Sequence, residues 1–504
     1  MSKLFLAANL LWLAGTVPFG ALANEAASRE LRGEHLDRQL EIAHRKAGFT
    51  GRIESTLEAR LGRRVDQRLA EVGRQLFFDP IGGLHNDNAC AGCHAPSAGF
   101  GDTQSIAIGV QNNRQVGPGR DGPRNQRRTP SVVNTAFYSA LMWNGRISAP
   151  SGSPFDNSMG FAFPAPEGTT MFPPGDALVT HLLIAQAHIP PTELNEAAGF
   201  TGTKGTIGPR FDAFDDGLGS NVPPPDASGF RNSPIRAAVV ARLNATEAYR
   251  QSFATVFPQV RDGAPISVAM FARAIAEFQF TLVRADAPVD QFARGHRSAM
   301  NDGEKRGALL FFGKANCVAC HAVAGASNEM FSDFKNRTIG VPQIAPSFGV
   351  GKGNTIFDGP AENEDFGLEQ VTGNSADRYR FRTSPLRNAV LQPSFFHNGS
   401  FTRLDMAIKH HLDVFDSARR YNAAAAGMAP DLRHRLGPIE PVLERVDPLL
   451  AMPMRLTRHE FDDLVSFVGQ GLLDRRARPR NLCGLVPESL PSGMPSLLFE
   501  GCRR

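Results

Sequence analysis

Two five-residue stretches decide the fold of this 504-residue chain: Cys90-Ala91-Gly92-Cys93-His94 and Cys317-Val318-Ala319-Cys320-His321. Both read C-x-x-C-H, the signature with which c-type haem is attached. Two thiols at this spacing reach the two vinyl groups on one porphyrin edge, and the adjacent His lies under the iron as an axial ligand. Two structural disulfides and a Cys₂His₂-type zinc site are the alternatives. Two copies in a chain that begins with an export signal favour two covalently bound haem c groups.

The export signal occupies residues 1–23. Lys3 precedes a largely apolar run over 4–19, and Ala21-Leu22-Ala23 ends the segment in an A-x-A pattern, which predicts cleavage before Asn24. The alternative, a membrane anchor, is disfavoured because Pro18 and Gly20 shorten the apolar run, and no later stretch approaches the roughly 20 apolar residues of a membrane helix. The sequence therefore predicts an exported, periplasmic protein that does not span a membrane.

The third cysteine pair, Cys483 and Cys502, lacks a following His. These two residues flank a segment rich in Pro and Gly near the end of the chain. In an oxidising compartment, the simplest interpretation is a disulfide that closes this tail.

The chain also repeats itself around its two motifs. The sequence GRQLFF at 73–78 precedes the first motif, and GALLFF at 307–312 precedes the second. Downstream, Asn134 and Asn144 recur as Asn388 and Asn398 at the same ten-residue interval. A duplication of this size predicts two similar haem domains, with Trp143 of the first copy aligned with His397 of the second.

The fold class that follows is mainly α, with two cytochrome c-like domains related by duplication and joined by long loops. Helical periodicity runs through 25–76, where Leu57, Leu61, Val65 and Leu69 share one face, and recurs at 235–257, 266–284, 302–312 and 457–472. Loops rich in Pro, Gly, Ser and Phe at 148–175 and 200–234 are expected to wall the first haem pocket. The predicted boundaries are a signal peptide at 1–23, a helical extension at 24–72, haem domains at 73–285 and 286–475, and a disulfide-closed tail at 476–504.

Axial ligands decide what each haem can do, because a six-coordinate haem transfers electrons whereas a five-coordinate one binds peroxide or O₂. His94 is the expected proximal ligand of the first iron, and no other His occurs before His181. Met142, Met159 and Met171 are alternative sixth ligands, each better explained as a packing residue. We therefore expect an open first haem.

At the second haem, His321 is the expected proximal ligand and His411 the candidate for the opposite face. His411 shares one helix face with the apolar Leu404 and Ile408. A buried, hydrogen-bonded core His is the alternative interpretation of this residue. Met452 and Met454 are the rival sixth ligands.

Several motifs together resemble the bacterial di-haem cytochrome c peroxidase family, including the related enzyme that matures methylamine dehydrogenase. The resemblance covers most of the chain, from about residue 65 to about residue 475. Its motifs are LFFDP at 76–80, the two C-x-x-C-H sequences, MWNGR at 142–146, FFG at 311–313, LRN at 386–388 and HNGS at 397–400.

The resemblance implies that H₂O₂ reacts at the N-terminal haem and that the C-terminal haem receives electrons from a small redox protein, a cytochrome c or a cupredoxin. A Trp between the haems relays the electrons in this family, and Trp143 matches it; core packing is the alternative role. The catalytic Glu of the family matches Glu167 best, displaced by a few inserted residues. Arg146 is a candidate for binding a haem propionate, or else for pairing with an acidic side chain.

Three features depart from the family pattern. The loop before Trp143 lacks the His that blocks the first haem in members that need reductive activation, so this chain resembles the members with a permanently open site. His411 stands where the usual ligand is Met, or Tyr in the maturation enzyme. A haem with two imidazole ligands has a lower reduction potential than a haem with one imidazole and one Met. The family's interdomain calcium is doubtful here because Arg128 matches the Asn that helps to hold it.

The function predicted best is an exported peroxidase that reduces H₂O₂. Oxidation of a protein or organic substrate by high-valent iron, and plain electron carriage, are the alternatives. The net charge of only +4 does not suggest a nucleic-acid partner. The sequence contains no signal for the oligomeric state.

Overall fold

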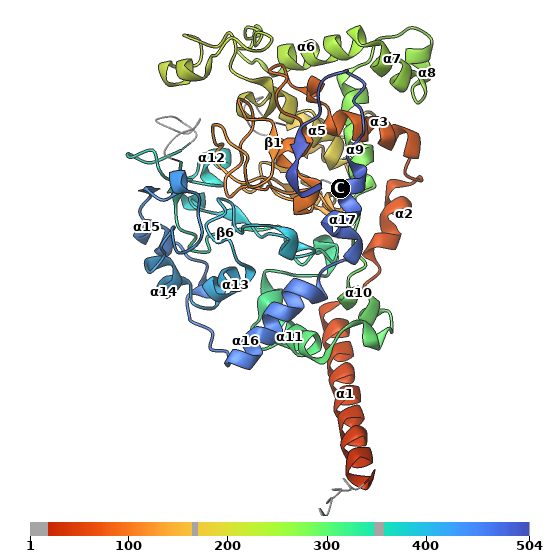
Figure 1. Cartoon of the computed structure of the whole chain (residues 1–504), viewed down its shortest axis with the longest axis vertical. Coiled ribbons are helices and arrows are strands. Elements are labelled where there is room, and N and C mark those ends of the chain that lie inside the picture. Colours follow the sequence, from red (N-terminus) through yellow and green to blue (C-terminus); the bar gives the residue numbers. More distant parts are fainter. Residues whose placement is uncertain (1–18, 164–169, 347–356, 503–504) are drawn as a thin grey trace, which may run out of the picture.

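The computed structural model describes residues 19–163, 170–346 and 357–502 of the chain (Figure 1). Most of its regular structure is helical, as the sequence predicts. The α-helices are α1 Phe19–Ala47, α2 Leu57–Leu61, α3 Gln67–Phe78, α4 Cys90–Cys93, α5 Leu182–Ala187, α6 Asn232–Ala245, α7 Glu247–Ala254, α8 Pro258–Arg261, α9 Val268–Phe280, α10 Pro288–Ala293, α11 Asp302–Phe312, α12 Glu369–Thr372, α13 Leu404–Leu412, α14 Val414–Arg419, α15 Glu440–Leu443, α16 Arg458–Ser466 and α17 Pro479–Leu482.

Strands in the described residues are only two or three residues long, and they hydrogen-bond neighbouring loop segments to each other. They are β1 Gln115–Val116, β2 Ala140–Leu141, β3 Ile147–Ser148, β4 Phe161–Ala162, β5 Thr170–Phe172, β6 Asn336–Arg337, β7 Ile344–Ala345, β8 Phe381–Arg382, β9 Arg435–Leu436 and β10 Leu498–Phe499. Strands β2 to β5 form one antiparallel sheet in the order β2-β3-β4-β5, and the other strands pair two by two. The first predicted loop, 148–175, therefore folds back on itself as a small sheet.

Each half of the chain is organised around two helices that touch through a glycine. Helix α3 packs on α9, and a Cβ on Gly73 would lie 1.8 Å from the carbonyl oxygen of Ala274. Helix α11 packs on α16 in the same way, where a Cβ on Gly307 would lie 2.0 Å from the carbonyl oxygen of Asp463. The predicted duplication is thus visible as the same helix contact in two cytochrome c-like domains.

Two hydrophobic cores surround these helix pairs. The first contains the buried rings of Phe77 and Phe78 and those of Phe100 and Phe278, which meet edge to face or tilted. The second is smaller and contains Phe311, Phe331 and Phe467 together with Leu40 of helix α1. Phenylalanine rings therefore form a large part of both cores.

The prediction of one continuous helix face through Leu57, Leu61, Val65 and Leu69 is wrong. Helix α2 ends at Leu61, where Gly62 adopts a left-handed conformation with φ +67°. Helix α3 begins after Asp66, whose carboxylate accepts hydrogen bonds from the backbone N–H groups at 68 and 69. An apolar spacing can persist through such a break because both short helices bury the same side. The patterns at 266–284, 302–312 and 457–472 are confirmed as α9, α11 and α16.

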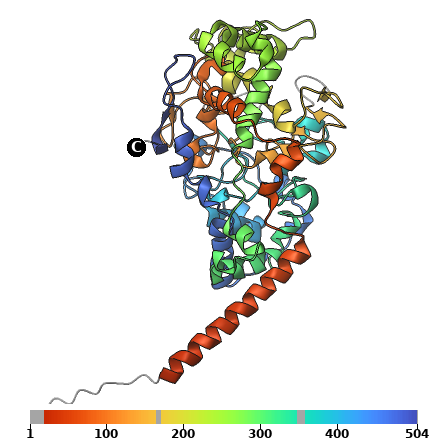
Figure 2. The same cartoon turned by 90° about the vertical axis from the view of Figure 1, so that its right-hand side faces the viewer.

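Helix α1 extends away from the rest of the molecule, and its last turns pack on α11 (Figure 2). Most of the predicted signal peptide, 1–23, lies outside the described residues. Among the residues that the structure describes, no helix combines the length and the apolar character that crossing a membrane requires.

The C-terminal tail returns from the second half to the first. A disulfide joins Cys483 and Cys502, and between them β10 pairs with β1 in parallel. The ring of Phe499 lies 5.6 Å from that of Phe78, and the side chain of Leu497 lies against Gly92 of the first haem motif. The tail therefore completes the first core.

We expect Gly73→Ala and Gly307→Ala each to lower the free energy of unfolding by about 2 kcal/mol or more, because an added methyl group overpacks a helix contact that has no space for it. Gly33→Ala in α1 is the matched control, since nothing lies within 4 Å of its Cβ position, and helix propensity favours Ala. Calorimetric melting temperatures of the three variants check this expectation. Unchanged melting of the first two would contradict the close helix contact.

Candidate haem sites

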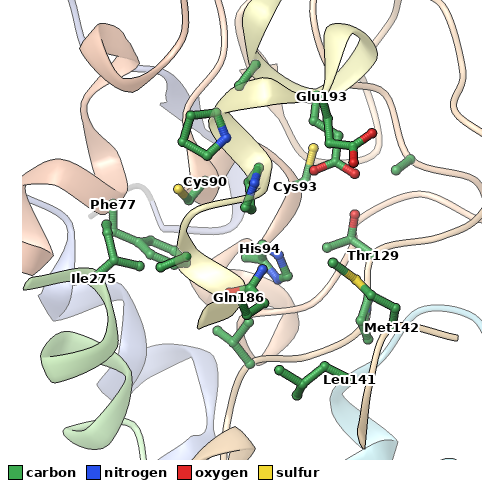
Figure 3. Close-up of a pocket in the computed structure, with 18 of the residues that line it drawn as sticks. Phe77, Cys90, Cys93, His94, Thr129, Leu141, Met142, Gln186, Glu193 and Ile275 are labelled. Atoms are coloured by element: carbon green, nitrogen blue, oxygen red, sulfur yellow. The ribbon is translucent and has the colours of Figure 1, made fainter. Parts of the chain in front are cut away.

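A cavity of about 670 Å³ lies beside the first C-x-x-C-H motif, within the range of pockets that hold drug-sized ligands and cofactors. Figure 3 shows Cys90, Cys93 and His94 facing the same space as Gln186 and Glu193. The residues that line the cavity and matter below are Phe77, Cys90, Cys93, His94, Asn125, Arg127, Arg128, Met142, Trp143, Arg146, Gln186, Glu193, Glu196 and Ile275, with Gln370 and Arg382 from the second half of the chain.

The first motif is shaped so that its imidazole can ligate a metal. Helix α4 consists of Cys90–Cys93 alone, and the N–H of His94 donates to the Cys90 carbonyl over 2.8 Å. The Nδ1 of His94 lies 3.3 Å from the carbonyl oxygen of Phe100, which leaves Nε2 for the metal. Burial lowers the pKa of His94 to about 4, so the ring is neutral at pH 7 and its lone pair is available.

The remaining wall of this cavity suits a porphyrin with two carboxylate side groups. Phe77 and Ile275 provide apolar surface. Arg127, Arg128 and Arg146 also line the cavity. Arg128 is buried, and its Nε has no hydrogen-bond partner. Nη2 of Arg128 donates to Gln392 over 2.9 Å, but a buried N–H without a partner costs free energy, and a propionate would accept from Nε.

Of the sixth-ligand candidates for the first site, only Met142 lines the cavity. Met159 is 57% exposed, and the side chain of Met171 lies outside the described residues. Within the described chain, His94 is the only histidine in the cavity wall. His181 and His188 are buried elsewhere, bonded to the backbone at Ala136 and Ile184.

The second motif brings two imidazoles together. His321 Nδ1 lies 2.9 Å from the carbonyl oxygen of Phe331, and His411 Nδ1 lies 2.8 Å from that of Ala407. Both Nε2 atoms are thereby left available to bind a metal. The two ring centres are 6.3 Å apart. An imidazole nitrogen lies about 2 Å from a metal that it ligates, so rings on opposite sides of one iron have centres about 6 Å apart.

Neighbouring side chains distinguish His411 from its rivals. Met452 is 81% exposed, and Met454 is held at the end of α13 by a bond from its N–H to the Leu412 carbonyl. The adjacent His410 is buried and bonded to Ile339 and Ser417, so it has the structural role that was the alternative for His411.

Trp143 lies where the two halves of the chain meet. Its indole Nε1 donates to the Arg128 carbonyl over 2.8 Å, and its own carbonyl accepts from the N–H of Arg382 in the second half over 2.7 Å. The N–H of Arg128 donates to the carbonyl of His397. The backbone of Arg128 thus bonds both to Trp143 and to His397, the residue that corresponds to Trp143 in the duplication. Arg128 is also the residue that made the family's calcium site doubtful in the sequence analysis. Among the described residues, no group of three or more His, Cys, Asp or Glu side chains is arranged to hold a metal ion.

Two glutamates that the sequence analysis did not select line the first cavity. Glu167 lies outside the described residues, whereas Glu193 and Glu196 face the cavity. Arg146 pairs with Glu193, Nη2 to Oε1, over 2.9 Å. Strand β3, the long segment that follows it and helix α5 lie between Trp143 and Glu193 in the sequence. The spacing of the two residues therefore does not indicate that both line the same cavity. The available signal was Pro190-Pro191 shortly before Glu193, a rigid turn that aims an acidic side chain.

Comparison with known proteins agrees with this geometry. A family model described as di-haem cytochrome c peroxidase matches residues 67–298. The methylamine utilization protein MauG of Methylorubrum extorquens is 26% identical over 377 residues, covering 74% of this chain and 76% of its own. Cytochrome c551 peroxidase of Pseudomonas aeruginosa is 23% identical over 350 residues, with 69% and 72% covered. These matches confirm the resemblance to the di-haem cytochrome c peroxidase family. The di-haem character of that family implies two haem c groups.

Solved structures show the same fold. A MauG-like protein associated with microbial copper homeostasis superposes with a TM-score of 0.52 at 22% identity, covering 82% of this chain and 91% of that one. The di-haem peroxidase BthA of Burkholderia thailandensis gives 0.51 at 20% identity, with 86% and 90% covered.

We expect His411→Ala to convert the second haem from low spin to high spin, because the iron loses a strong-field imidazole. An EPR spectrum of the purified protein measures this directly. Met454→Leu is the comparison variant and should leave the spectrum unchanged. A low-spin signal that survives in H411A and disappears in M454L would assign the ligand to Met454 instead.

Proposed function

We propose that this protein is a peroxidase that reduces H₂O₂ at the first haem, with electrons that enter at the second haem from a small redox protein. The observation that carries the proposal is an asymmetry between the two sites. His94 faces a wide cavity without a second histidine in its described wall. His321, in contrast, is faced by His411, with 6.3 Å between the centres of the two rings. An iron with one free face binds peroxide, and an iron with two imidazoles transfers electrons.

The first site offers the groups that peroxide cleavage requires. When bound, the haem supplies the iron that accepts H₂O₂. Glu193 then takes a proton from the near oxygen and returns it to the leaving oxygen, as a general acid–base group does. Arg146 holds the carboxylate of Glu193 through their ion pair, which keeps it aimed into the cavity.

Electrons reach the first site through the contact between the two halves. Trp143 is buried at this contact and bonded to both halves through Arg128 and Arg382. Its flat, polarisable indole is suited to electron transfer, and the two hydrogen bonds hold it in one orientation. The proposal also includes export, because residues 1–23 have the pattern of a signal peptide and a disulfide such as Cys483–Cys502 is typical of oxidising compartments.

Oxidation of a protein or organic substrate is the second candidate function. Two imidazoles set a lower potential on the second haem than the His/Met pair of many cytochromes, and the relatives include MauG as well as peroxidases. Steady-state turnover of H₂O₂ with reduced cytochrome c separates the candidates. Rapid turnover supports the peroxidase, whereas none with every small donor tried would favour the second function.

We expect Glu193→Gln to slow peroxide cleavage by at least about 100-fold, since the amide cannot accept and return the proton. Glu167→Gln, which changes the residue chosen from sequence, should leave the rate near that of the wild type. Stopped-flow absorption of the haem after mixing with H₂O₂ gives both rates. A slow E167Q beside a normal E193Q would transfer the acid–base role to Glu167.

We expect Trp143→Phe to slow electron transfer between the haems while peroxide still binds, because the more easily oxidised ring is lost. Photoreduction of the second haem, followed by absorption at both haems, measures the transfer rate. The same rate in W143F as in the wild type would restrict Trp143 to packing.

A further inference from the structure

A second carboxyl group stands beside Glu193 in the first cavity. Glu193 caps a single turn with π-helical bonding, Leu194–Ala198, and Glu196 is the third residue of that turn. The N–H groups of Glu196, Ala197 and Ala198 all donate to the Glu193 carbonyl, over 3.0 to 3.2 Å. This bonding fixes the backbone between the two glutamates, and both side chains line the cavity.

The backbone of Glu196 is also anchored to the first haem motif. Asn88 Nδ2 donates to the Glu196 carbonyl over 2.7 Å, and Asn88 Oδ1 accepts from Arg120 over 2.8 Å. Asn88 precedes Cys90 by two residues. The hydrogen bond from Asn88 therefore fixes the position of Glu196 relative to the haem-attachment motif.

Arg146 is the cation that interacts with both carboxylates. The charged and titratable groups that face Glu196 are Glu193 from its own turn, Arg146 from between β2 and β3, and the thiols of Cys90 and Cys93 from α4. The thiols are consumed when haem is attached. Arg146 is already paired with Glu193, so a second negative charge in this desolvated space is unfavourable.

Burial, together with the charge of Glu193, raises the pKa of Glu196 to about 7. The carboxyl of Glu196 therefore gains and loses its proton near neutral pH.

The proposed reaction consumes protons, and the carboxyl of Glu196 is a source of protons inside the cavity. Reduction of one H₂O₂ to two water molecules takes up two electrons and two protons. Glu193 moves one proton from one oxygen to the other and ends as it began, so the two protons of the net reaction have to be supplied separately. We propose that Glu196 is the group that supplies protons to Glu193 in the first cavity and regains them from solvent. This inference rests on the proposed peroxidase function.

The expected pH dependence follows from the protonated form of Glu196. Below about pH 7 the neutral carboxyl is present and proton supply is complete. As the pH rises through this range the proton is lost, so turnover falls while peroxide cleavage through Glu193 continues.

The test uses the holoprotein and its Glu196→Gln and Glu196→Asp variants, with the exposed Glu247→Gln on α7 as the control. In E196Q we expect about a tenfold lower turnover and loss of the fall near neutral pH, whereas E196D retains the fall and E247Q matches the wild type. Infrared spectra of ¹³C-glutamate-labelled protein should show a protonated carboxyl that titrates near neutral pH in the wild type and is missing in E196Q.

A wild-type pH profile and carboxyl band that both persist in E196Q would overturn the proposal. The infrared measurement does not depend on turnover. A wild-type protein that shows the band but does not reduce H₂O₂ would therefore refute the peroxidase function, and a peroxidase without the band would refute the role of Glu196.

Discussion

The contact of two helix backbones through a glycine is the constraint on which each half of the molecule depends. At Gly73 and at Gly307 a side chain of any size would meet a carbonyl oxygen of the neighbouring helix. This close approach brings the paired phenylalanines at the end of α3 and of α11 against the haem motif that follows. In each half, the proximal histidine is then oriented by the carbonyl of a phenylalanine with a left-handed backbone, Phe100 or Phe331.

From this shared frame the two halves diverge at the opposite face of the haem site. In the second half, helix α13 presents His411 to His321. In the first half, the corresponding space is bounded by the turn that carries Glu193 and Glu196 and by the segment around Trp143. The same helix frame therefore supports one site in which two histidines face each other and one with an acidic cavity wall. The difference lies in loops, which change without disturbing the core.

Much of this could be predicted from the sequence, because the decisive features are local. The C-x-x-C-H motifs, their repeat, the apolar face that contains His411 and the pairing of Cys483 with Cys502 each depend on residues close together or on a simple count. The continuous helix expected through Leu57 and Leu69 failed because side-chain spacing does not report a break at Gly62. Glu193 was missed because a motif match relies on the spacing between residues, and an inserted segment changes that spacing. The structure shows instead which side chains line the cavity, whatever their separation along the chain.

The return of the tail to the first half has a consequence for how the molecule loses its structure. Phe78 and Gly92 belong to the N-terminal half, yet they are covered by Phe499 and Leu497 of the tail, which follows the second half in the sequence. The first core is therefore complete only when the tail is docked on it. Detachment of the tail would expose apolar surface beside the first haem motif, so the tail and the first core form one cooperative unit.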